Sequence, residues 1–183
     1  MAEQEREWTL MNSRDLFIVA ALLCTGTIVR FILVQMGEPV TPNVLVAFYS
    51  LAIMVTLPSF GESVGIGFAA GIIASFISRS VFNPAFLISE PLGAAVCLGV
   101  FLALRYHKQA ARFAAPLLAT IASGLVFLSL AVSAGSSGIQ AVFPDTRSFL
   151  ITLLGVVAIT ALVNSLAAGL AYPHLRPQAA GNT

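Results

Sequence analysis

Three charged side chains interrupt otherwise apolar sequence, at Arg30, Arg79 and Glu90. Arg30 lies deep inside a long apolar run. A charge that faces lipid near the membrane centre costs at least about 2.5–3.5 kcal/mol, so we expect Arg30 to face a cavity or a partner. The alternative is that its long side chain reaches the outer membrane interface. In a cavity, an arginine is suited to bind a carboxylate through two parallel hydrogen bonds.

Arg79 and Glu90 are separated by one short loop, in the stretch SRSVFNPAFLISEP. They can form a salt bridge with each other, or they can bind the carboxylate and ammonium groups of a zwitterionic ligand. Phe82, Asn83 and Phe86 lie in the same loop and would add apolar walls and a hydrogen-bonding group to a pocket. The sequence therefore predicts a substrate site composed of Arg30, Arg79, Glu90, Asn83, Phe82 and Phe86.

The composition is that of a membrane protein. Of the 183 residues, 58% are hydrophobic and only 9% are charged, whereas soluble domains carry about 25% charged residues. Most of the exterior is therefore expected to face membrane lipid. The net charge of +1 gives no basic field of the kind that binds nucleic acid.

Motifs of known enzyme classes are absent from the sequence. It contains no HExxH, GxSxG or Walker A motif. Cys24 and Cys97 both lie in apolar runs, without the spacing of a metal site. We therefore expect no metal, no other cofactor and no catalytic residue, with an intramembrane enzyme of sparse site kept as a rival interpretation.

Six apolar stretches predict an all-α bundle of transmembrane helices, because spanning the hydrocarbon core takes roughly 20 helical residues. The second is short and is bracketed by Pro42 and Pro58, which suggests a buried helix or a partial crossing. A long loop is expected at 133–145. The predicted helices cover about 15–36, 43–58, 62–81, 89–106, 113–134 and 147–172.

Four polar or proline residues carry further predictions about these helices. Ser89 is a plausible N-cap of the fourth helix, with Pro91 in its first turn. Asn43 is expected to cap the second helix. Asn164 lies in the middle of the sixth helix, where a hydrogen bond to another helix is expected.

Basic residues predict the orientation, because cytoplasmic loops carry an excess of Lys and Arg. With both termini inside, six of the nine basic residues lie on the inner side: Arg6, Arg14, Arg105, Lys108, Arg112 and Arg176. The predicted organisation is a cytoplasmic arm (1–14), a transmembrane domain (15–172) and a cytoplasmic tail (173–183).

Small residues four apart mark the first predicted helix, at Ala20 and Cys24 and at Ala21 and Thr25. Such stripes let helix backbones pack closely. Packing within the bundle is the commoner explanation, and docking of another membrane protein is the alternative.

The glycine and proline pattern of about residues 11–106 resembles a known family. The segments MNSRDLFIVAALLCTGTIVRFI, TPNVLVAFYSLAIM and LPSFGESVGIGFAAGIIASF are similar to those of the substrate-binding S components of energy-coupling factor (ECF) transporters. The tryptophan-transporter-like branch is the most similar.

This resemblance implies a six-helix receptor in the cell (inner) membrane of a prokaryote. Its pocket would open outward and bind a vitamin, an amino acid or a related small molecule. A membrane T component and two cytoplasmic ATPase subunits would be its partners. The small-residue stripe at Ala20, Ala21, Cys24 and Thr25 would contact the T component.

Arg30 shifts the expected ligand, since a full arginine favours a carboxylate-bearing compound over tryptophan itself. The expected function is thus substrate binding for uptake, powered by a separate ATP-driven module. Two alternatives stay open, a solitary secondary carrier and a non-transport scaffold of the MreD type.

Overall fold

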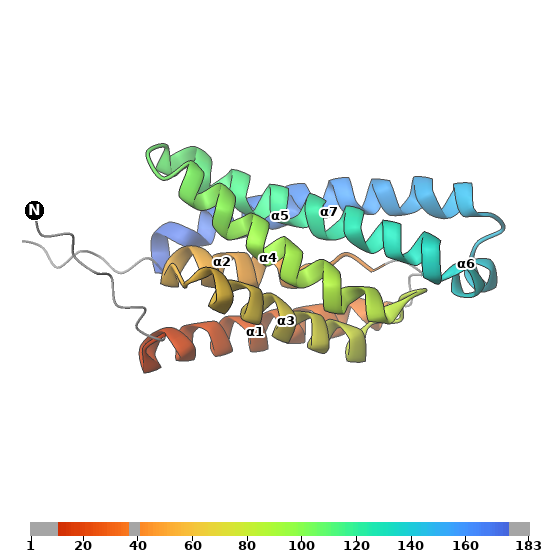
Figure 1. Cartoon of the computed structure of the whole chain (residues 1–183), viewed down its shortest axis with the longest axis horizontal. Helices are drawn as coiled ribbons and strands as arrows, with labels where there is room; N and C mark the ends of the chain where they lie inside the picture. The colour runs from red at the N-terminus through yellow and green to blue at the C-terminus, as the bar shows by residue number, and fades with distance from the viewer. Residues whose placement is uncertain (1–10, 37–40, 176–183) are drawn as a thin grey trace, which may run out of the picture.

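The computed structural model describes residues 11–36 and 41–175. Within these ranges every regular element is a helix, which confirms the predicted all-α class. Figure 1 shows the long helices side by side in one elongated bundle. In chain order the elements are α1 (Ser13–Val34), α2 (Leu45–Thr56), α3 (Phe60–Ile77), the 3-10 helix η1 (Asn83–Ala85), α4 (Phe86–Ala103), α5 (Lys108–Ala134), α6 (Ser136–Val142) and α7 (Thr146–Leu175).

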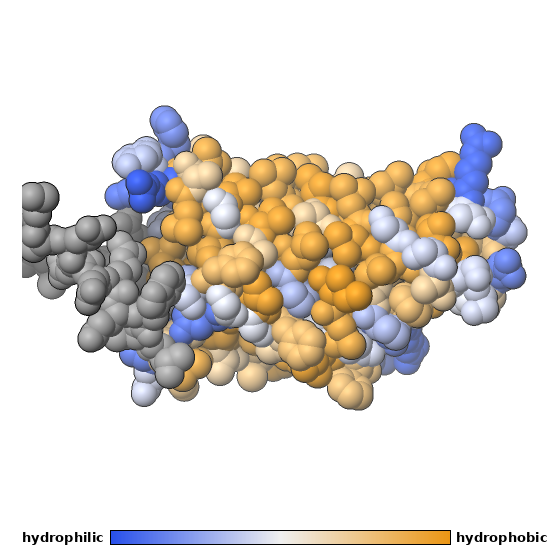
Figure 2. Space-filling model, viewed as in Figure 1, coloured by the Kyte–Doolittle hydropathy of each residue, from blue (hydrophilic) through white to orange (hydrophobic). Residues whose placement is uncertain are grey.

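Five elements are long and apolar enough to cross a membrane, namely α1, α3, the continuous η1–α4 segment, α5 and α7. Figure 2 shows apolar residues over the middle of the bundle and hydrophilic residues at its two ends. The chain is therefore a helical multi-pass membrane protein. The remaining predicted span is the second one (43–58), which corresponds to α2, and its 12 residues are fewer than the roughly 20 that a full crossing takes. The N-in, C-in orientation stays a prediction.

The short helix α2 lies at the centre of the bundle. It contacts all five long helices, and most of its residues are buried. Figure 1 shows it in the half of the bundle nearer the start of α1, with a non-helical stretch leading to it from the α6 end. Leu57 ends the helix in a left-handed conformation (φ 49°), which is uncommon for a residue with a side chain, and Pro58 follows. The sequence correctly predicted that α2 is short and buried.

The first turn of α3 joins two parts of the fold. Ser59 and Glu62 form a capping box, in which each side chain binds the other residue's backbone N–H. The other carboxylate oxygen of Glu62 accepts a hydrogen bond from the backbone N–H of Met11 (2.7 Å). The start of α1 is thereby held against the start of α3.

The start of α4 differs from the prediction. The helix begins at Phe86, and Ser89 is buried inside it instead of capping it. The expectation of a loop up to Ser89 was wrong because the turn of η1 leads directly into the helix. The start of α4 also packs closely on α3, since a Cβ added at Gly71 would lie 2.5 Å from the carbonyl oxygen of Phe86.

The segment 133–145 is also more ordered than predicted. It contains α6, and Ile139 of this helix is buried. A Cβ at Gly138 would lie 2.2 Å from the carbonyl oxygen of Val81, so α6 packs directly against the loop after α3. The expectation of a long loop was wrong because this segment covers the end of the bundle with an apolar side chain.

The boundaries of the predicted arm and tail fall partly within helices. Asn12 caps α1 by accepting a hydrogen bond from the backbone N–H of Asp15 (2.9 Å), and α7 continues to Leu175. The rest of the predicted arm and tail, including Arg6 and Arg176, lies outside the described residues.

Candidate ligand-binding site

Arg30 of α1 faces the interior of the bundle. Only 1% of its surface is exposed, so the side chain does not reach a membrane interface. Its guanidinium donates hydrogen bonds to Oδ1 of Asn43 and to Oγ of Ser78 (3.3 Å). The guanidinium carbon lies 4.9 Å from the centre of the Phe86 ring, a distance typical of a cation–π contact.

Glu90 of α4 is completely buried. Its Oε1 accepts hydrogen bonds from Nδ2 of Asn43 (2.5 Å) and from Oγ of Ser123 (3.0 Å). Its Oε2 has no hydrogen-bond partner among the described residues. The hydroxyl of Tyr49 lies next to Glu90, but no hydrogen bond of acceptable geometry joins the two.

Asn43 links the two buried charges. Its amide oxygen accepts from Arg30, and its amide nitrogen donates to Glu90. Only this orientation of the amide works, because the reverse would place donor against donor and acceptor against acceptor. The predicted capping role of Asn43 was wrong, since Val44 occupies the N-cap of α2 and no side chain caps that helix. Its amide is used to connect the charges instead.

The backbone at Asn43 is held from the other side of the bundle. Nδ2 of Asn164 in α7 donates to the carbonyl oxygen of Asn43 (3.0 Å) and to Oγ1 of Thr120 in α5 (3.0 Å). This confirms the predicted interhelical role of Asn164. The non-helical segment before α2 is thus bonded through α7 to α5, which fixes the position of the Asn43 side chain.

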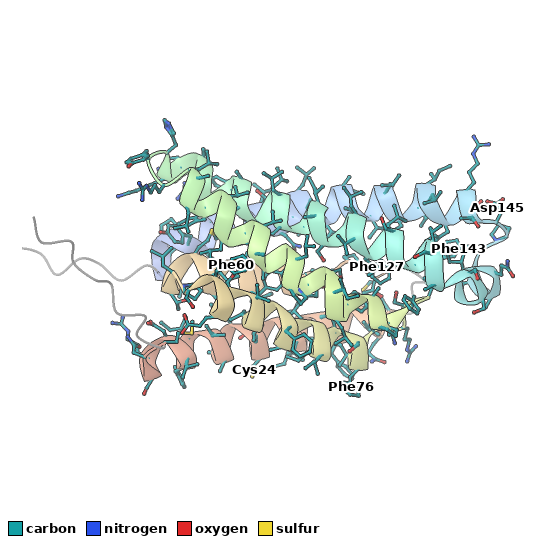
Figure 3. All side chains as sticks on the ribbon, in the orientation of Figure 1. Cys24, Phe60, Phe76, Phe127, Phe143 and Asp145 are labelled. Carbon is teal, nitrogen blue, oxygen red and sulfur yellow. The ribbon has the colours of Figure 1, made fainter. Side chains whose placement is uncertain are left out.

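A cavity of about 60 Å³ adjoins this cluster. Glu90, Asn43 and hydroxyl residues of α5 and α7 form its polar wall, and Phe86, Phe127 and aliphatic residues of α7 form its apolar wall. The rings of Phe86 and Phe127 lie 4.9 Å apart. Figure 3 places Phe127 toward the α6 end of the bundle, in the half that α2 does not fill.

The structure brings three of the predicted substrate-binding residues together. Glu90 and Phe86 line the cavity, and Arg30 reaches its wall through Asn43 and Ser78. Arg30 itself is not a lining residue.

The other three predicted residues lie elsewhere. Arg79 is exposed. Asn83 is used locally, because it donates to the carbonyl oxygen of Ser78 (3.0 Å) and accepts from the backbone N–H of Ser80 (3.2 Å). Phe82 packs against Gly135, where an added Cβ would lie 2.9 Å from the Cβ of Phe82.

Hydroxyl residues of the second half of the chain were missed. Thr120 and Ser123 are one turn apart on α5, and Thr160 lies one turn before Asn164 on α7. All three hydroxyl residues line the cavity. The spacing within the pairs Thr120/Ser123 and Thr160/Asn164 places both members of each pair on one helix face. Polar pairs at this spacing in an apolar sequence are the signal that could have predicted a polar interior.

The small residues predicted to dock a partner lie on the surface. Ala20, Ala21, Cys24 and Thr25 are all exposed, and Figure 3 shows Cys24 at the outer edge of α1. The hydroxyl of Thr25 donates to the carbonyl oxygen of Ala21 (2.8 Å), so its polar group is satisfied within the helix. The stripe is accessible to a partner, and docking stays a prediction.

Known proteins provide no further guide to the site. Comparisons with protein-family models, with curated proteins and with solved structures gave no match to this chain. Within residues 11–36 and 41–175, no group of three or more His, Cys, Asp and Glu side chains is placed to hold a metal ion.

Proposed function

We propose that this protein is a membrane-embedded binding subunit for the uptake of a small molecule. The observation that carries the proposal is the cavity beside Glu90, which lies between helices of the bundle and is lined by both polar and apolar side chains. Ligand sites characteristically combine an apolar wall with a few oriented polar groups. Ionisable groups inside a membrane typically mark a pathway or a site for substrate.

Unpaired polar atoms on residues that line the cavity favour a ligand over a purely structural role. Glu90 Oε2 and Thr160 Oγ1 are buried and have no partner among the described residues. Leaving such a group unpaired costs about 1–3 kcal/mol. A ligand that bonds to these atoms offsets this cost, whereas a scaffold of the MreD type gains nothing from it.

The position of the cavity also suits a transport protein. Transporters commonly place their substrate sites deep in the membrane, where a helix is interrupted. Here the non-helical residues before α2 line the cavity, and α2 itself is too short for a full crossing. The expected ligand is an amino acid, a vitamin or a related compound of the cell exterior.

We also propose that ATP hydrolysis by partner subunits powers the uptake. The resemblance to ECF S components implies a membrane T component and two ATPase subunits, in the inner membrane of a prokaryote. The exposed stripe of Ala20, Ala21, Cys24 and Thr25 is the proposed contact with the T component. The sequence contains no Walker A motif, so ATP hydrolysis would be supplied by other subunits.

Native mass spectrometry of the purified protein tests the binding function. We expect a co-purified small molecule that is retained by the wild type and lost from Glu90→Gln. The matched control is Glu62→Gln, which changes a carboxylate of α3 outside the cavity lining and should retain the molecule. If neither the wild type nor the control carries a co-purified molecule, and no added small molecule forms a complex with the protein, the binding function is wrong.

Uptake into proteoliposomes separates the two transport classes. A binding subunit should bind its ligand alone but accumulate it only with an ATPase module. Accumulation by the purified chain alone, driven by an ion gradient, would instead identify a solitary secondary carrier.

A further inference from the structure

Building on the proposed function, we infer that the cavity binds the protonated amine of a small ligand, with Glu90 as its counter-ion. The carboxylate is completely buried, and its Oε2 has no hydrogen-bond partner among the described residues. Glu90 is also a lining residue of the cavity. A group that enters the cavity is therefore offered an anionic acceptor.

The other polar side chains of the wall are an amide and hydroxyls, which can all accept a hydrogen bond, and none of them is a second charge: Thr41, Asn43, Ser78, Ser80, Thr120, Ser123 and Thr160. Ser123 uses its hydroxyl hydrogen to bind Glu90, which leaves the lone pairs of its oxygen available. Thr160 Oγ1 is buried and unpartnered among the described residues. Thr120 donates to the carbonyl oxygen of Pro116 (2.8 Å) and accepts from Asn164 (3.0 Å), so it has little capacity left. An ammonium group, with three donors and no acceptor, matches this inventory.

Arg30 is less suited to bind a ligand in this cavity. Its two terminal nitrogens donate to Asn43 and Ser78, its guanidinium carbon lies 4.9 Å from the centre of the Phe86 ring, and only its Nε has no partner among the described residues. Arg30 is not among the residues that line the cavity. The charge that the cavity presents is therefore that of Glu90, and the ligand carboxylate expected from the sequence would lack a free cationic partner there.

The remaining wall suits a short apolar group attached to the amine. Phe127 of α5 and Leu153, Val156 and Val157 of α7 also line the cavity. The volume of about 60 Å³ admits only a small substituent without rearrangement. The inferred ligand is thus a small amine whose carbon chain contacts α5 and α7.

Tyr49 is the competing donor that must be considered. Its buried hydroxyl lies next to Glu90 without forming a hydrogen bond of acceptable geometry. The substitution Tyr49→Phe removes this hydroxyl and with it one possible competitor for Oε2. An amine that binds Oε2 should bind this variant at least as tightly as it binds the wild type.

Three probes with one carbon skeleton test the inference, namely n-propylamine, 1-propanol and propionate. The purified protein in nanodiscs is heated at pH 7.5 with increasing concentrations of each, because a ligand that binds only the folded state raises Tm by an amount that grows with the logarithm of its concentration relative to Kd. We expect a rise in Tm that depends on concentration in this way with propylamine only. In Glu90→Gln the apparent Kd should weaken at least tenfold, while Glu62→Gln should keep the wild-type value.

The comparison of probes uses the wild type, so it does not depend on the folding of any variant. Stabilisation by propionate or equally by propanol overturns the amine assignment but leaves the binding function in place. The same holds if the co-purified molecule contains no amine. If no probe binds and no molecule co-purifies, both the amine assignment and the binding function fail.

Discussion

The two halves of the bundle interior differ because α2 fills only one of them. In the half that contains α2, Ala52, Ile53 and Met54 are at most 1% exposed and belong to a continuous apolar core. In the other half, the non-helical segment before α2 lies beside the cavity, with Arg30 and Glu90. A helix of 12 residues is about 18 Å long, and the hydrocarbon core is about 30 Å thick.

The contrast between the apolar and polar halves shows how one short helix can leave room for a polar interior. Non-helical backbone at membrane depth is tolerated only where protein buries it or where it lines a cavity. Here Asn164 binds the carbonyl oxygen of Asn43, and the side chain of Asn43 joins the two buried charges. The described non-helical residues before α2 therefore both satisfy a backbone carbonyl and organise the candidate site.

Removing one of the two buried charges should cause the largest loss of stability. Arg30→Met leaves Glu90 buried without its compensating cation, which costs about 3–5 kcal/mol when a buried pair is broken. The free energy of unfolding in mixed micelles, measured by denaturant titration, should fall by this amount. The same substitution is expected to leave the apolar half around α2 intact.

The double variant Arg30→Met with Glu90→Gln is the matched control. Removing both charges also removes the uncompensated one, so most of the lost stability should return. A single Arg30→Met variant as stable as the wild type would contradict the view that these two charges depend on each other.

The link between the charges should show the next largest effect. Asn43→Leu removes hydrogen bonds to both Arg30 and Glu90, and hydrogen bonds to charged groups contribute about 1.5–3 kcal/mol each. The expected loss is about 3 kcal/mol by the same titration. A loss below about 1 kcal/mol, as expected for a simple helix cap, would mean that Asn43 does not connect the two charges.

The apolar half was largely predictable from the sequence, and the polar half only in part. Helix lengths follow from runs of apolar residues, which persist whatever the helices pack against. Pro42 and Pro58 bracket a short run, and this local signal predicted the buried helix α2. Arg30 was expected to face the interior on energetic grounds that do not require knowledge of its partners.

The partners themselves depend on tertiary packing. Asn43 lies 47 residues from Glu90 and 121 residues from Asn164, and no local pattern indicates these contacts. Arg79 and Glu90 are close in sequence, but the former is exposed and the latter is buried. Proximity in sequence suggested one site for both, whereas the helix faces on which they lie separate them.

Disturbing the close packing of α3 on α4 should lower the free energy of unfolding by a smaller amount. In Gly71→Ala the new Cβ would lie 2.5 Å from the carbonyl oxygen of Phe86, so α4 must shift where it carries Phe86 and Glu90. Overpacking of this kind costs about 1–3 kcal/mol. Gly65→Ala is the control, because its Cβ would meet nothing within 4 Å. Equal stabilities of the two variants would show that α3 does not set the position of α4.

The smallest change in the free energy of unfolding is expected for substitution of Thr160, and the sign of this change is informative. Its hydroxyl is buried and unpartnered among the described residues, so Thr160→Val removes a polar group that gains nothing in the ligand-free protein. The free energy of unfolding should stay the same or rise by up to about 1 kcal/mol, since replacing an unpaired polar group by an apolar one of similar shape is neutral or favourable. Thr152→Val, on the exposed face of the same helix, controls for the change in side-chain type. A clear loss of stability in Thr160→Val alone would show that this hydroxyl supports the fold, whereas unchanged stability with weaker propylamine binding would assign it to the ligand site.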